Sequence, residues 1–404
     1  MHDADRVEAV LRYHERSKHQ FHRYARSTGS LDWVNQPDPF RRYEGAPLIQ
    51  LPILDADEEP LSPRYDDLYR RGSVPSAPLS LRSLSRLFEY ALALSAWKQA
   101  GGTRWALRSN PSSGNLHPTE GYLLIGALAG LADAPGLYHY ALREHGLERR
   151  ASGSAEWFAQ LLREFPPQAF LVGLSSRDDP VAWTVIDEVA LASRKPISER
   201  YVLELFDAPA PPRETNALPD GSPAGQIIRQ RRSLLACDGR TSITAERFCG
   251  MLARVMPRVG LAANRRPMPW DAIAWEPRIH LALFVHRVDG LDSGLYMLVR
   301  DPAKLDKLKR AMHQRFDWST PPGCPADTPL RLLEVGDARR LVEAEAAGVA
   351  ATGIGCFFDD PVHQVFGFSD LEFQSLYHFT IGGPVHDSRL TTLAPYAKRS
   401  LFNP

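Results

Sequence analysis

The sequence predicts an α+β protein made of two similar halves, each with helices packed on a mixed or antiparallel sheet. Three observations support this fold class. Two segments with helical spacing of apolar residues are each followed by short apolar strands. Residues 130–140 resemble residues 290–298, which indicates an internal duplication. A proline-rich stretch, residues 207–225, separates the two copies. We therefore expect the halves to be related by an approximate two-fold axis.

The N-terminal region predicts a helix followed by an extended arm. Apolar residues recur at helical spacing near the start, so we expect a helix over residues 5–25. Six prolines between residues 32 and 64 exclude long helices, and this segment predicts an arm wrapped over another part of the molecule. Helical spacing returns at Leu81, where we expect a second helix that ends near Lys98.

The remaining elements follow the same order in each copy. The first copy has a polar loop at residues 107–118 and then strands at 121–126 and 136–140. The second has a helix from Thr244 and strands at 279–285 and 290–298. The domain organisation that we expect is an N-terminal helix and arm, a first copy, a linker and a second copy, over residues 1–75, 76–206, 207–225 and 226–404.

Charge and hydropathy exclude several classes of function. The 404 residues carry 48 basic and 48 acidic side chains, so no net charge favours nucleic acid or an anionic membrane. The longest uncharged apolar runs are shorter than the ~18 residues of a membrane span. Charged side chains interrupt the first twenty residues, so we expect no signal peptide and a cytoplasmic protein.

The cysteine and histidine positions indicate neither a metal site nor a disulfide framework. The four cysteines are far apart in sequence, without a Cys-x-x-Cys pair, which argues against a zinc site and against a disulfide scaffold. A reducing compartment is therefore expected. The histidines, among them His117, His139, His280 and His363, show no metal-ligand spacing, so we expect no bound metal.

Three stretches could carry chemistry, and each has a purely structural alternative. Residues 227–240 place Arg231, Arg232 and Ser233 before a helix, which suits a phosphate monoester but also a solvated surface. Residues 111–115, Pro-Ser-Ser-Gly-Asn, could contact the polar edge of a heterocycle or form a simple turn. The small residues at 348–358 allow close approach to a flat ring, or close packing of a helix on a strand.

Taken together and in this order, these stretches resemble the nitroreductase superfamily of flavoproteins, in its tandem SagB-type dehydrogenase branch. The resemblance covers most of the chain. It rests on five segments: Tyr13 to His19, Pro111 to Pro118, Arg231-Arg-Ser, Gly353-Ile-Gly and the tail from Leu390 to Tyr396. The resemblance implies two nitroreductase-like halves in one chain, which form an intrachain pseudo-dimer with noncovalent FMN at their junction. A further homodimer is left open.

The resemblance also implies which residues bind the cofactor. It places Arg231, Arg232 and Ser233 at the FMN phosphate and ribityl chain, with Lys398 or Arg399 adding positive charge. The flavin ring would be contacted by Ser112, Ser113 and Asn115 from the first copy and by the backbone of Gly353 and Gly355 from the second. Each copy has only one of the two polar motifs, so one complete flavin site per chain is expected.

The sequence departs from the family pattern at two kinds of position. Leu235 stands where the wider superfamily often has a basic residue. The central helix expected in each copy is absent after Ser176 and again after Leu341. Either the protein lacks these helices, or the sequence as printed omits chain between residues 175 and 181 and between residues 339 and 344. In the second case, consecutively numbered residues there would be separated by far more than ~3.8 Å.

Two functions from different classes follow. The first is an FMN-dependent oxidoreductase that transfers hydride, either by azoline dehydrogenation of a small-molecule or peptide substrate or by nitro or quinone reduction with NAD(P)H. No catalytic residue is assigned for it. The second, motivated by Leu235 and the absent helices, is a flavin-free descendant that binds a partner or acts as a scaffold.

Overall fold

The computed structural model describes most of the residues of the chain. They are residues 3–20, 22–25, 38–53, 63–70, 72–112, 115–166, 168–176, 184–194, 221–233, 236–258, 261, 266–273, 276, 278–325, 328–337 and 359–396. The two stretches where the central helices are expected fall in segments 177–183 and 338–358, outside the described residues. No helix among the described residues is long and apolar enough to cross a membrane.

The first half is built on a five-stranded antiparallel sheet. Its strand order is β1-β6-β5-β4-β7, and every neighbouring pair is antiparallel. The strands are β1 (Leu48–Gln50), β4 (Thr119–Ile125), β5 (Gly136–Ala141), β6 (Gly146–Ser152) and β7 (Leu171–Ser176). Strands β4 and β5 confirm the two strands predicted for the first copy.

Helix α2 (Leu81–Ala91) provides the main cover of this sheet. Ser80 caps its N-terminus by accepting a hydrogen bond from the backbone N–H of Ser83 (3.1 Å). Its buried face includes Phe88, whose ring stacks on that of Tyr140 at 4.5 Å between centroids. The core of the first half therefore lies between α2 and the sheet.

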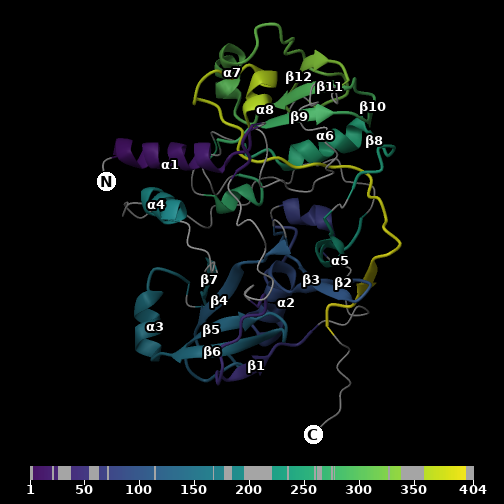
Figure 1. The fold of residues 1–404 in the computed structure, drawn as a ribbon. Coiled ribbons are helices and arrows are strands. Elements are labelled where there is room, and N and C mark those ends of the chain that lie inside the picture. The colour runs from purple at the N-terminus through teal and green to yellow at the C-terminus, as the bar shows by residue number, and fades with distance from the viewer. Residues whose placement is uncertain are drawn as a thin grey trace.

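The second half has its own three-stranded antiparallel sheet, with strand order β12-β11-β9. Figure 1 shows it in a separate part of the molecule from the five-stranded sheet. Its strands are β9 (Leu281–Val285), β11 (Gly294–Leu298) and β12 (Leu330–Val335). The short strands β8 (Ile243–Thr244) and β10 (Val288–Asp289) pair in parallel beside it. The mixed α+β fold class is thus confirmed.

Helices cover this smaller sheet, and their packing forms two further apolar clusters. The covering helices are α6 (Ala245–Arg254), α7 (Leu305–Ala311) and α8 (Asp359–Phe366). Helix α5 (Ala224–Gln230) precedes them in the chain. Thr244 caps α6, because its hydroxyl accepts the backbone N–H of Arg247 (3.3 Å), as the predicted helix start requires. Single-turn helices η2 (Tyr65–Tyr69), η5 (Trp270–Ala272) and η6 (Pro302–Lys304) complete the connections.

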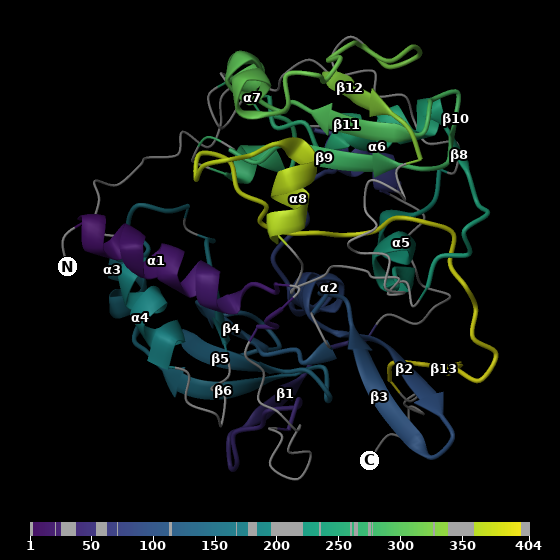
Figure 2. The ribbon, with the colours of Figure 1, turned by 45° about the horizontal axis from the view of Figure 1, so that its top comes forward.

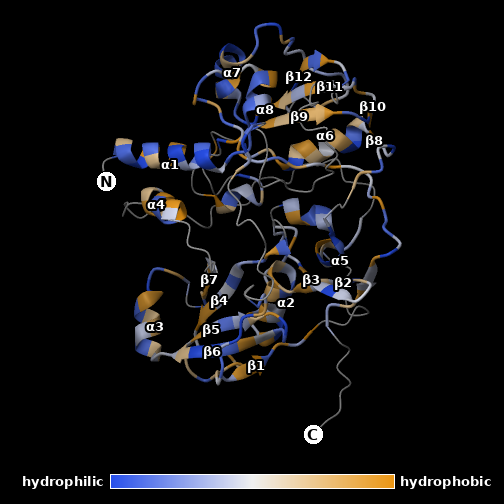
Figure 3. Ribbon diagram, in the orientation of Figure 1, coloured by the Kyte–Doolittle hydropathy of each residue, from blue (hydrophilic) through white to orange (hydrophobic). Residues whose placement is uncertain are grey.

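Helix α1 (Asp3–Ser17) lies along α4 (Thr184–Ala192) on one side of the molecule (Figures 1 and 2). Arg12 forms an ion pair with Glu188, and Arg6 donates to the backbone oxygen of Ala192 (2.7 Å). Figure 3 shows α4 as largely apolar and α1 as mostly hydrophilic. Helix α3 (Ala155–Leu161) lies beside the first sheet, and Ser154 caps it.

The arm predicted for residues 32–64 is described in residues 38–53, 63 and 64. Its residues Leu48–Gln50 form the edge strand β1 of the first sheet, and Arg42 and Tyr43 contact residues of that sheet. A buried polar cluster joins the two. His139 bridges two carboxylates, with Nδ1 2.8 Å from Glu148 and Nε2 2.9 Å from Glu120. From the arm, Arg42 donates to Glu148 through Nε (2.6 Å), and the backbone N–H of Tyr43 donates to the same carboxylate (3.1 Å).

Two helix predictions need correction. The N-terminal helix was expected over residues 5–25, but α1 ends at Ser17. The second was expected to continue to Lys98, but α2 ends at Ala91 and residues Leu94–Ala100 form strand β2. Alanine and leucine favour helix locally, yet this segment pairs with strands on both of its edges, and the tertiary pairing overrides the local preference.

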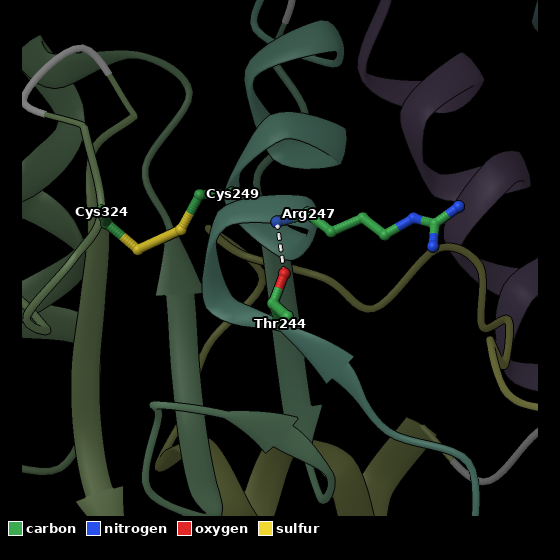
Figure 4. Close-up of a disulfide and its surroundings, with 4 residues drawn as sticks. All are labelled: Thr244, Arg247, Cys249 and Cys324. Carbon is green, nitrogen blue, oxygen red and sulfur yellow. Dashed lines mark hydrogen bonds between the residues drawn. A yellow bond between two sulfur atoms is a disulfide. The ribbon is translucent and has the colours of Figure 1, made fainter. Parts of the chain in front are cut away.

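The cysteine prediction is also corrected. Cys249 of α6 and Cys324, in the loop before β12, form a disulfide across 75 residues, as Figure 4 shows. The two cysteines are far apart in sequence, so spacing did not indicate that they pair. The fold brings them together because α6 and that loop pack against the same sheet. With this disulfide present, the cysteine spacing does not indicate a reducing compartment.

Candidate functional site

The predicted arginine segment lies where α5 meets the first half of the molecule. Arg231 is the residue at the C-terminal cap of α5, and its Nη2 donates a hydrogen bond to the backbone oxygen of Ser109 (3.2 Å). Arg232 donates from Nη2 to the backbone oxygen of Ser95 (2.9 Å). Ser233 follows at the surface. The segment thus belongs to the second half by sequence but contacts the first half.

Positive charge gathers at this contact. Arg229 forms an ion pair with the buried Glu89 of α2 (3.0 Å), whereas no carboxylate of the described residues pairs with Arg231 or Arg232. Burial lowers the pKa of Arg229, and burial together with the neighbouring Arg231 lowers the pKa of Arg232. One of the three guanidinium groups in this segment is thus paired with a carboxylate and two bond backbone oxygens, and the excess of positive charge suits an anion.

The polar loop begins at the residue that Arg231 contacts. Ser109 is itself fixed, because its backbone N–H donates to Ala93 (2.9 Å) and its hydroxyl donates to the backbone oxygen of Glu89 (2.9 Å). Further along, the Ser112 hydroxyl accepts the backbone N–H of His117 (2.9 Å). The loop therefore starts from an anchored point next to the arginines.

Asn115 organises the rest of the loop. Its Nδ2 donates to the backbone oxygen of Ala106 on strand β3 (Thr103–Arg108; 3.0 Å), and its Oδ1 lies 2.7 Å from Nε2 of His117. Both Asn115 and His117 have left-handed backbones, with φ of 57° and 48°. Few residues besides glycine and asparagine tolerate this region, so the loop holds a specific shape rather than a generic turn.

The C-terminal tail reaches the same place from the second half. Strand β13 (Thr391–Leu393) pairs antiparallel with β2 and completes a three-stranded sheet with order β13-β2-β3, visible in Figure 2. Beyond it, Trp97 of β2 donates through Nε1 to the backbone oxygen of Pro395 (2.9 Å). The buried hydroxyl of Tyr396 accepts the backbone N–H of Leu94 (3.1 Å) and donates to the backbone oxygen of Leu142 (3.0 Å).

These contacts converge on the start of β2. Ala93 binds the loop, Leu94 binds the tail, and Ser95 binds the arginine segment. Three stretches that are far apart in sequence therefore meet at three consecutive residues. We call this junction, defined by Ala93 to Ser95 with Arg231, Ser109 and Tyr396, the β2 junction.

The structure places half of the predicted site residues. Arg231, Arg232, Ser233, Ser112 and Asn115 all lie in the segments that flank the β2 junction. The other five fall outside the described residues: Ser113, Gly353, Gly355, Lys398 and Arg399. Sequence reasoning missed Ser109, Glu89 and the residues of β2. The only available signal for Ser109 was its position two residues before the Pro-Ser-Ser-Gly-Asn motif.

Comparison with known proteins supports the fold. No protein-family model and no curated protein matches the chain. Among solved structures, the chain is similar to a candidate nitroreductase from Anabaena variabilis, with a TM-score of 0.53 and 16% sequence identity. The match covers 93% of this chain and 99% of the other. The chain therefore has a nitroreductase-like fold.

Proposed function

We propose that the protein is an FMN-dependent oxidoreductase, of the tandem SagB-type dehydrogenase kind, with its flavin held at the β2 junction. The observation that carries the proposal is the meeting of the Arg231 segment, the Ser109–Asn115 loop and the C-terminal tail at residues 93–95. A nitroreductase-like fold agrees with a flavin oxidoreductase. The two halves would then act as an intrachain pseudo-dimer, divided by the linker at residues 207–225.

The chemistry of the β2 junction fits the phosphate of FMN. The Arg231 side chain is fixed at one end, because Nη2 donates to Ser109, and its charge is not neutralised by any carboxylate of the described residues. A guanidinium that already has one hydrogen bond loses less side-chain freedom on binding a phosphate oxygen than one without such a contact. In this proposal Ser233 adds a hydroxyl, and Lys398 or Arg399, which follow Tyr396 closely in sequence, add charge.

The loop fits the polar edge of the flavin ring. Ser112 and Asn115 provide a hydroxyl and an amide on a backbone of defined shape, and Ser113 lies between them in sequence. In the proposal, Gly353 and Gly355 let the backbone approach the ring from the second half. When bound, FMN supplies the hydride chemistry, and the protein supplies binding and orientation.

The proposed substrates are those of a flavin dehydrogenase or reductase. An azoline-containing small molecule or peptide, or a nitro or quinone acceptor reduced with NAD(P)H, is compatible with the same cofactor site. We assign no nucleic-acid or membrane partner.

A flavin titration tests the proposal. The visible spectrum of the purified protein is recorded before and after addition of FMN, and binding is followed by quenching of flavin fluorescence. We expect flavin absorbance and saturable binding of one FMN per chain. A protein without flavin that shows no saturable binding would instead support the flavin-free scaffold, the alternative in which the arginines serve only their backbone contacts.

A further inference from the structure

Glu89, near the C-terminal end of α2, contacts two of the segments that meet at the β2 junction, and the proposed function gives it no role. Its carboxylate pairs with Arg229 of α5, with Oε1 3.0 Å from Nη1. Its backbone oxygen accepts a hydrogen bond from the hydroxyl of Ser109, where the polar loop begins (2.9 Å). One residue of the first half therefore holds both the loop and the last turn of α5.

The contacts around Glu89 form a closed ring. Nη1 of Arg232 donates to the backbone oxygen of Arg229 (2.6 Å), so the last turn of α5 is tied to the arginines that follow it. Nη2 of Arg231 donates to the backbone oxygen of Ser109 (3.2 Å), and the hydroxyl of Ser109 returns to Glu89. The ring thus begins and ends at Glu89 and includes the guanidinium that we propose for the FMN phosphate.

The ion pair in this ring is largely removed from solvent. The side chain of Glu89 is 6% exposed and that of Arg229 is 24% exposed. Burial lowers the pKa of Arg229, so the surroundings disfavour its positive charge. Loss of one partner from such a pair leaves the other charge uncompensated, which costs more than it does at an exposed surface. The position of Arg229 therefore depends on Glu89.

The charge of Glu89 also reaches the C-terminal tail. Burial raises the pKa of Tyr396 to about 12, and the negative charge of Glu89 contributes to this shift. The hydroxyl of Tyr396 accepts the backbone N–H of Leu94 (3.1 Å), which is the tail contact of the β2 junction. Glu89 therefore lies close to all three segments that meet there.

We propose that Glu89 is a positioning residue for the flavin site. By holding Arg229 it fixes the last turn of α5, and so places the guanidinium of Arg231 beside Ser109 for the FMN phosphate. This inference rests on the proposed function, since it assumes that FMN binds at the β2 junction. Positioning and simple electrostatics predict opposite results for a neutral residue at position 89. Removing a negative charge near a bound anion favours binding, whereas loss of positioning weakens it.

The test compares FMN with riboflavin, which has the same ring and ribityl chain but no phosphate. Fluorescence titration measures both affinities. We expect Glu89→Leu to bind FMN about tenfold more weakly and riboflavin within about twofold of the wild type. Arg229→Met should show the same selective loss, and the double variant should lose no more than either single variant, because both changes break one contact. Glu246→Gln, which removes an exposed carboxylate from α6, is the control and should match the wild type.

A conservative variant and the phosphate-free ligand separate positioning from general stability. Glu89→Gln keeps an acceptor for Arg229 without the charge, so its FMN affinity should lie between those of the wild type and Glu89→Leu. If Glu89→Leu does not fold, Glu89→Gln and Arg229→Met provide the comparison. Unchanged or tighter FMN binding in these variants would overturn the inference, as would equal losses for FMN and riboflavin. A wild type that binds both ligands equally would overturn the phosphate contact and this inference with it, whereas a wild type that binds neither would overturn the proposed function.

Discussion

Arg231 donates a hydrogen bond to the backbone oxygen of Ser109, a residue 122 positions earlier in the chain (3.2 Å). This contact joins the start of the second half to the loop of the first. Because the guanidinium is held by a carbonyl and not by a carboxylate, its charge stays available to an anion while its position is fixed. A single side chain thereby links two motifs that are more than 100 residues apart in the sequence.

The first prediction concerns this guanidinium. Arg231→Ala should weaken FMN binding by about 1.5–3 kcal/mol, the range for a hydrogen bond to a charged group. Fluorescence titration with FMN measures the change. Arg247→Ala, at an exposed position on α6 outside the stretch 227–240, serves as the control and should bind as the wild type does. Equal affinities in the two variants would argue against a phosphate at Arg231.

The second prediction concerns the attachment of the tail. Tyr396→Phe removes one hydroxyl, so the backbone N–H of Leu94 and the backbone oxygen of Leu142 both lose a partner. The free energy of unfolding should fall by about 1–3 kcal/mol, as expected when buried polar groups are left unpaired. Chemical denaturation measures the effect. Tyr377→Phe changes an exposed tyrosine and should leave stability unchanged; a similar loss there would contradict the assignment.

The third prediction concerns the disulfide. Cys324→Ala should lower the free energy of unfolding by about 2–4 kcal/mol, since the bond closes a long loop in the unfolded chain. Denaturation curves with and without reductant measure the difference, which should disappear when the wild type is reduced. Cys237→Ala removes the cysteine that is free in the described structure and should show no such dependence on reductant. Alkylation of both Cys249 and Cys324 in the unreduced, unfolded protein would refute the bond.

The fourth prediction concerns how stability depends on pH through Glu148, the carboxylate that binds Arg42 and Tyr43 of the arm. Burial opposes the charge on Glu148, but hydrogen bonds from Arg42, His139 and the backbone of Tyr43 outweigh it and lower the pKa of the carboxyl below 4.5. A lowered pKa means that the charged form stabilises the fold above pH 4.5 and that this contribution is lost as the pH falls through the folded-state value.

Glu148→Gln isolates this contribution. The difference in unfolding free energy between wild type and variant should be constant from neutral pH to about pH 5 and should shrink on further acidification. Equilibrium denaturation at a series of pH values measures it. Glu44→Gln, at an exposed position on the arm, should show a flat difference throughout. A difference in unfolding free energy between wild type and Glu148→Gln that grows on acidification would show that the fold raises, and does not lower, the pKa of Glu148.

The sequence alone determined the elements whose signals are local. Strands β4 and β5 were predictable from short apolar runs with flanking turn residues, and α6 from Thr244, whose hydroxyl caps the helix whatever packs around it. The fold class followed from the order of these elements. The segments that we propose to bind the cofactor were also chosen from the sequence, because clustered arginines and hydroxyl-rich turns are recognisable by composition.

Strand β2, the disulfide and the β2 junction were decided only by the tertiary structure, because each depends on pairing between residues that are far apart in the chain. Residues Leu94–Ala100 became a strand because β3 and the distant tail supply hydrogen-bond partners on its two edges. The bond between Cys249 and Cys324 requires α6 and a later loop to share one sheet face, which no spacing rule encodes. The β2 junction forms for the same reason. Its three segments are brought together by pairing and burial between distant parts of the chain, and local propensity carries no information about that pairing.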